Sequence, residues 1–252
     1  MSDVKPRALT TWRPLLAELI GTALLVTVVV GSGIAAARLS PSDSGLQLLE
    51  NSTATVFGLA VLILVFGPVS GGHFNPVISA VDWLLTRRRP GNGLSAAGVA
   101  TYGAAQLVGA ILGALLANMM FDLPAVQISG KDRLTLGHGL GEVVATAGLV
   151  LLVFALARTG RAALSAAAVG AYIGAAYWFT SSTSFANPAV TVGRIFSDTF
   201  AGIAPTSALF FIAAQLVGGL VGLGLVRLFF PDAPVTAGRA VVPHPNHLSE
   251  ES

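Results

Sequence analysis

Six long apolar segments constrain this chain more than any other feature of its sequence. Each has on the order of 20 residues, the length that an α-helix needs to cross a bilayer. Of the 252 residues, 54% are hydrophobic and only 10% are charged, whereas soluble domains have roughly 25% charged residues. The sequence therefore predicts an all-α membrane protein with six transmembrane helices. These lie at about residues 14–37, 52–68, 95–120, 137–157, 162–181 and 206–229.

Two further apolar segments, at about 75–86 and 187–196, are too short to cross a bilayer. Each follows a turn rich in glycine or serine and begins with Asn-Pro. Asparagine is a strong N-cap and proline is tolerated at the first helical position, so both segments are predicted to be re-entrant half-helices. Their first residues are Asn75, Pro76 and Val77 in one case, and Asn187, Pro188 and Ala189 in the other.

The two halves of the chain, about 14–120 and 137–230, share landmarks in the same order. Glu18 is matched by Glu142, the first Asn-Pro by the second, and Gln106 by Gln215. Since each half has three spans, the second half starts from the opposite membrane face, which makes the repeats inverted. We therefore expect one channel domain over 1–230, and a disordered cytoplasmic tail over 231–252.

Basic residues predict the orientation of the chain. With six spans, ten of the 14 Lys and Arg residues fall on the side of the two termini. Because cytoplasmic loops are enriched in Lys and Arg, both termini are predicted to be cytoplasmic, in the inner or plasma membrane. The formal charge of +2 gives no reason to expect a nucleic-acid partner.

The half-helices predict the electrostatics of the membrane midplane. Their N-termini would meet there, each with about half a positive charge and several unpaired N–H donors. Positive helix ends disfavour cations and protons in membrane pores. A neutral hydroxylated solute, in contrast, could accept hydrogen bonds from Asn75 and Asn187.

Two motifs, with the glutamates of spans one and four, resemble those of the aquaporin or major intrinsic protein family. They are Ser-Gly-Gly-His-Phe-Asn-Pro-Val, ending at Val77, and Thr-Ser-Phe-Ala-Asn-Pro-Ala, ending at Ala189. The resemblance implies the family fold, a homotetramer with one pore per subunit, passive conduction, and the two asparagines at the pore midpoint. The stretch from Ser184 to Arg194 also resembles a bacterial branch associated with arsenic handling.

The chain departs from this family at the expected outer constriction. Water-selective members have arginine three residues after the second Asn, where this chain has Val190. Arg194 lies seven residues after Asn187, nearly two helical turns, and either faces the outer vestibule or lies outside the pore. Counting back places Thr55, or with a two-residue gap Phe57, and Ala175 at the other constriction positions. These residues predict a wide and weakly polar filter.

The positions of several polar residues in the predicted spans and loops suggest their roles. An unpaired acid within a span is costly, so Glu18 and Glu142 are each expected to accept hydrogen bonds from the re-entrant loop of their own half. An acid that reaches the membrane interface and a proton relay are the alternatives. His73 is expected near the cytoplasmic pore mouth. The two glutamines and the aromatic residues are assigned to packing.

The sequence thus favours a passive channel for small neutral solutes: water, glycerol-like polyols, and arsenite or other metalloid acids. The alternatives are a strictly water-selective channel, a secondary transporter with similar inverted repeats, and a junctional membrane protein. Neither an enzyme nor a cofactor is expected, and with four His and no Cys no metal site is expected either. The expected partners are lipid, the solute and identical subunits.

Overall fold

The computed structural model of the chain describes residues 12–87 and 93–231. Within these ranges all regular secondary structure is helical. The helices are α1 (Trp12–Leu39), α2 (Ser44–Ser70), α3 (Pro76–Thr86), α4 (Ala96–Met120), α5 (Leu136–Arg158), the 3-10 turn η1 (Ala162–Leu164), α6 (Ser165–Phe179), α7 (Pro188–Arg194) and α8 (Pro205–Phe229).

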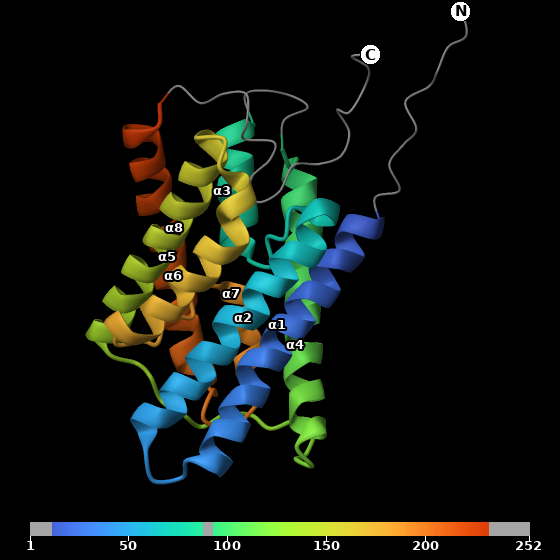
Figure 1. The fold of residues 1–252 in the computed structure, drawn as a ribbon, viewed down its shortest axis with the longest axis vertical. Coiled ribbons are helices and arrows are strands. Elements are labelled where there is room, and N and C mark those ends of the chain that lie inside the picture. The colour runs from blue at the N-terminus through green and yellow to red at the C-terminus, as the bar shows by residue number, and fades with distance from the viewer. Residues whose placement is uncertain (1–11, 88–92, 232–252) are drawn as a thin grey trace, which may run out of the picture.

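The long helices form one bundle around the two short ones (Figure 1). Helix α1 begins and α8 ends at the same end of this bundle, and the segment between α4 and α5 crosses its opposite end. The short helices α3 and α7 contact each other and also pack against α4 and α8. Both half-helices are therefore held inside the bundle, away from surrounding lipid.

Within the described residues, six helices are long and apolar enough to span a membrane. The expectation of six spans is thus confirmed. The largest boundary difference is at α2, which begins at Ser44 rather than near 52. Asp43 caps this helix by accepting a hydrogen bond from the Leu46 N–H, 2.9 Å away. The first turns of α2 are too polar to be recognised from hydropathy as part of a membrane span. Residues 232–252 of the predicted tail lie outside the described residues.

Close helix pairing follows the internal repeat. Helix α1 packs most extensively against α4, and its counterpart α5 packs against α8. Glycines make the first contact possible: a Cβ atom at Gly109 would collide with the backbone of Leu19, and one at Gly113 with that of Ala23. Small residues let helix backbones approach in this way where lipid gives no hydrophobic driving force.

This packing predicts the effect of adding a single methyl group to α4. Gly109→Ala places a Cβ atom against the α1 backbone, and overpacking of this kind costs about 1–3 kcal/mol. We expect a lower thermal unfolding temperature in detergent. Gly103→Ala is the matched control, because a Cβ atom at that position of α4 meets nothing within 4 Å. Equal stability of the two variants would contradict the close α1–α4 approach.

Candidate functional site

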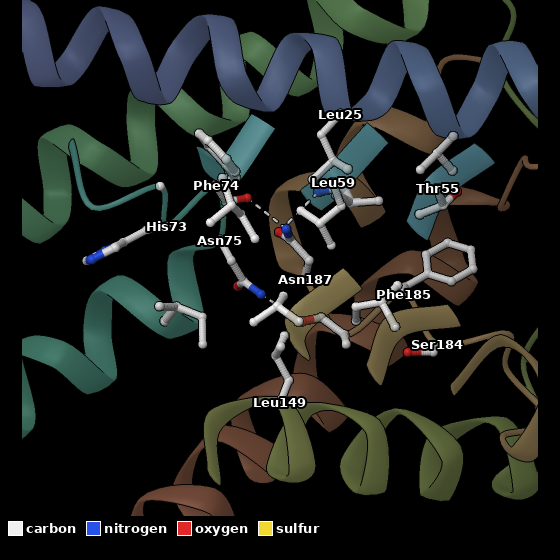
Figure 2. A pocket seen from close by; sticks show the side chains of 18 of the residues that line it. Leu25, Thr55, Leu59, His73, Phe74, Asn75, Leu149, Ser184, Phe185 and Asn187 are labelled. Atoms are coloured by element: carbon white, nitrogen blue, oxygen red, sulfur yellow. Dashed lines mark hydrogen bonds between the residues drawn. The ribbon is translucent and has the colours of Figure 1, made fainter. Parts of the chain in front are cut away.

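An internal cavity runs past the N-termini of both half-helices. Figure 2 shows Asn75 and Asn187 near its middle, with His73 toward one end and Thr55 and Phe185 toward the other. Apolar side chains from four long helices form much of its wall, and the two re-entrant loops with their half-helices form most of the rest. The apolar wall consists of Leu25, Val29, Leu59, Ile63, Leu149, Val153, Val169 and Ile173.

The two asparagines cap their own helices and bind the opposite loop. Asn75 Oδ1 accepts from the Val77 N–H, and Asn187 Oδ1 accepts from the Ala189 N–H, both at 2.9 Å. Asn75 Nδ2 donates to the Ala186 carbonyl, 2.8 Å away. Asn187 Nδ2 donates to the Phe74 carbonyl, 2.7 Å away. Since an amide nitrogen has two hydrogens, each asparagine keeps one donor for a molecule in the cavity.

The first loop is held by Glu18, which is fully buried in α1. Its carboxyl accepts from the backbone N–H groups of His73 at 3.0 Å and Phe74 at 2.7 Å. It also accepts from Ser70 Oγ at 2.6 Å and Gln106 Nε2 at 2.7 Å. Two loop N–H groups that would otherwise be unpaired inside the protein are thereby satisfied.

The second loop is held in the same way by Glu142 of α5. This carboxyl accepts from the N–H groups of Phe185 at 2.9 Å and Ala186 at 2.8 Å. Gln215 Nε2 donates to it from 2.6 Å and also to Thr191 Oγ1 from 2.9 Å. Gln106 likewise donates to Ser79 Oγ, 3.2 Å away. The two glutamines, which the sequence assigned to packing, therefore join each glutamate to the half-helix of its repeat.

The two loops share an unusual backbone conformation. Phe74 and Ala186, each directly before its asparagine, have positive φ values of 48° and 49°. Gly72 and Ser184, two residues earlier, have φ values of 60° and 50°. A non-glycine residue in this region costs about 1–3 kcal/mol and persists only where its surroundings enforce it. The hydrogen bonds to the glutamates supply that constraint.

The other residues of the two predicted midpoint motifs do not line the cavity. Pro76 and Pro188 occupy the first helical positions of α3 and α7. Ala189 is fully buried. Val77 packs against α8, where a Cβ atom at Gly219 would lie 2.6 Å from Val77 Cγ1. Although Val77 is larger than Ala189 at the matching position, it does not narrow the cavity, because Gly219 leaves space for its methyl groups.

The structure also corrects the expected constriction. Thr55, Val190 and Arg194 line the cavity, whereas Phe57 is 67% exposed on the bundle surface. Ala175 is exposed and does not line the cavity. It lies two residues from Ile173 and from Tyr177, which do line the cavity. Two residues rotate a helix by about 200°.

Tyr177 and Phe185 are lining residues that the sequence did not identify. The Tyr177 hydroxyl lies 3.2 Å from Thr55 Oγ1, which joins α6 to α2 across the cavity. The ring of Phe185 lies beneath Arg194, whose Cζ is 3.4 Å from the ring centroid.

At the other end, His73 lines the cavity and its Nδ1 lies 3.1 Å from Ser79 Oγ. Within the described residues, no cluster of His, Cys, Asp or Glu could hold a metal ion.

The glutamate network predicts a specific loss in Glu142→Gln. The new amide nitrogen would face N–H donors, so at least one charge-assisted hydrogen bond worth about 1.5–3 kcal/mol disappears. We expect a lower unfolding temperature and faster amide hydrogen exchange at residues 183–187. Glu50→Gln is the control, because that carboxyl accepts from Ser40 Oγ outside both networks. Unchanged exchange in the loop would show that Glu142 does not hold it.

Comparisons with known proteins agree with this architecture. The profile of the family described as Major intrinsic protein matches residues 5–186 and 165–251. Aquaglyceroporin AqpS of Rhizobium meliloti (strain 1021) is 46% identical over 227 residues, covering 88% of this chain and 93% of that protein. Aquaporin Z of Photorhabdus laumondii is 32% identical over 247 residues, covering 87% and 98% of the two chains.

A solved structure shares the fold. The aquaglyceroporin from Plasmodium falciparum superposes with a TM-score of 0.59 at 20% sequence identity, covering 86% of this chain and 96% of that one. The profile match and the identity to the two bacterial relatives extend over most of this chain. The chain is a member of the major intrinsic protein family, whose members are multi-pass membrane channels.

Proposed function

We propose that this protein is a passive channel for small neutral solutes, with glycerol-like polyols and neutral metalloid acids such as arsenite among its substrates. The observation that carries this proposal is the mixed lining of the cavity. Apolar side chains of four helices form much of it, and Asn75, Asn187 and the re-entrant loops add polar groups to the same space. The similarity to aquaglyceroporin AqpS supports the same substrate class.

A polyol suits such a lining because its two faces differ. Its hydroxyl groups can accept from the free N–H of each asparagine, while its carbon chain lies against the apolar wall. Arsenite in its neutral form is also a small trihydroxy molecule, so it offers comparable hydrogen-bonding groups. An ion would lose its hydration here with little compensation.

The composition of the lining also bears on ion-coupled transport. His73, Tyr177 and Arg194 are its titratable side chains, and no carboxyl group is among the lining residues of the described chain. A secondary transporter would need a site that coordinates its coupling ion at the midplane. The lining thus favours passive conduction over coupled transport. We propose no enzymatic reaction at this site.

We further propose the setting in which the channel works. The excess of Lys and Arg on the side of the termini supports cytoplasmic termini in the cell membrane. The end of the bundle that holds Arg194 is then the outer end. Membership of the family supports a homotetramer with one pore in each subunit.

Stopped-flow light scattering on proteoliposomes tests the substrate class. Gradients of water, glycerol and arsenite should be run on one preparation, and all three fluxes should exceed those of protein-free liposomes without saturating. Fast water flux without solute flux would establish the strictly water-selective alternative. Saturable uptake that depends on an ion gradient would establish the transporter.

Val190→Arg tests the width of the outer constriction. Val190 lines the cavity and is 5% exposed, so a longer side chain there has to enter the conduction path. We expect glycerol flux to fall at least tenfold, a barrier increase of about 1.4 kcal/mol or more, while water flux falls less. Val190→Ala, which adds no bulk, should conduct glycerol at least as well as the parent protein. Equal loss of both fluxes in Val190→Arg would contradict the wide filter.

A further inference from the structure

Three positively charged side chains gather at the outer end of the cavity around residues 200–202. Arg194 Nε donates to the Ala201 carbonyl. Arg133 Nε donates to the Gly202 carbonyl at 3.0 Å, and its Nη2 to the Phe200 carbonyl at 3.3 Å. Lys131 Nζ donates to the same Phe200 carbonyl from 2.9 Å. All three cations thus bind neutral carbonyl oxygens, which do not cancel their charges.

The nearby carboxyl groups are engaged in other hydrogen bonds. Asp132 Oδ1 accepts from Ser207 Oγ at 2.7 Å and from the Leu134 N–H at 2.9 Å. Asp198 Oδ1 accepts from the Gly130 N–H at 3.1 Å. Partial burial lowers the pKa of Lys131 to about 8, the charges of Arg133 and Arg194 act in the same direction, and the charge of Asp198 acts in the opposite one. Each arginine has a larger effect than Asp198, so the charges around Lys131 are predominantly positive.

The segment that contains Arg133 is fixed in place although it has no regular secondary structure. The Ser129 N–H donates to the Ile195 carbonyl at 2.8 Å, and the Ala204 N–H donates to the Lys131 carbonyl at 2.8 Å. The Arg133 N–H donates to Ser207 Oγ at 2.9 Å. The connection between the two repeats is therefore attached to the residues that follow α7 and to the start of α8.

Phe185 connects Arg133 to the cavity. Its ring lies 3.4 Å from Arg194 Cζ and 5.3 Å from Arg133 Cζ, measured at the ring centroid. Arg194 and Phe185 are lining residues, whereas Arg133 is not. The Phe185 ring thus separates the Arg133 guanidinium from the conduction path, and Arg133 does not narrow that path.

From this arrangement we propose that Arg133 is a specificity-determining residue, which acts with Arg194 to exclude protons and monovalent cations at the outer entrance. This role rests on the proposed channel function. It accounts for a channel that has valine at position 190: positive charge is supplied by Arg194 on the cavity lining and by Arg133 behind Phe185. Neutral polyols, which feel little of this field, pass through the space that Val190 leaves.

The test measures proton influx into proteoliposomes under a valinomycin potassium diffusion potential, with glycerol flux measured on the same preparation. At an effective dielectric constant of about 20, loss of a unit charge that lies just behind the ring of a lining residue changes ion passage by at least about tenfold. Arg133→Gln should therefore raise proton influx about tenfold and leave glycerol flux within about twofold. Arg133→Lys, which keeps the charge, should resemble the parent protein.

Arg38→Gln is a matched control for loss of a cation at this end of the bundle. Arg38 donates to the Phe121 carbonyl at 2.5 Å and lies over the Phe121 ring, and it does not line the cavity. Its proton influx should equal that of the parent protein. An equal rise in Arg38→Gln, or a rise in Arg133→Lys, would assign the effect to loop structure and overturn the proposal.

The absence of cysteine from the sequence allows a test within one folded preparation. Arg133→Cys should leak protons, and a positively charged methanethiosulfonate should restore the barrier while a negatively charged one should not. Identical leaks after both reagents would refute the proposal. Absence of glycerol flux in the parent protein would instead refute the channel function, so the two failures are distinguishable.

Discussion

Two buried carboxyl groups hold the geometry on which the rest of this molecule depends. The re-entrant loops expose backbone N–H groups inside the protein, where water cannot satisfy them. Glu18 and Glu142 each accept two such groups and so keep the residue before each asparagine at positive φ. With these residues fixed, the Phe74 and Ala186 carbonyls accept from the asparagine of the opposite repeat. Each loop therefore helps to position the other.

The same hydrogen bonds determine what the site offers to a solute. Each asparagine uses its side-chain oxygen to cap its helix and one N–H to bind the opposite loop. One N–H remains on each, and its direction is fixed by the bonds already made. Because both groups face a cavity whose wall is largely apolar, the site is suited to molecules with a polar and an apolar face.

The sequence predicted the parts of this structure that repeat or follow helical periodicity. The six spans are apolar along their length, and Asn-Pro marks each half-helix. Side chains that depend on helix rotation were harder to place: a two-residue error put Ala175 where Tyr177 faces the cavity. The size of Val77 could not be interpreted without its contact with Gly219, which is distant in sequence. Gln106 and Gln215 were visible as a repeated pair, but their bonds to the glutamates depend on the tertiary fold.

Arg133 could not be found from motifs, because its role depends on the path of the connection between the repeats. That path is set by backbone pairing with the residues that follow α7, which no local pattern reveals. Its position separates two properties that one arginine in a constriction would combine. Such an arginine narrows the path and also repels cations, so widening the filter by removing it would weaken the ion barrier. Because the charge of Arg133 lies behind Phe185, it does not affect the width of the path, which depends on lining residues such as Val190. The width of the path and the barrier to ions can then vary independently.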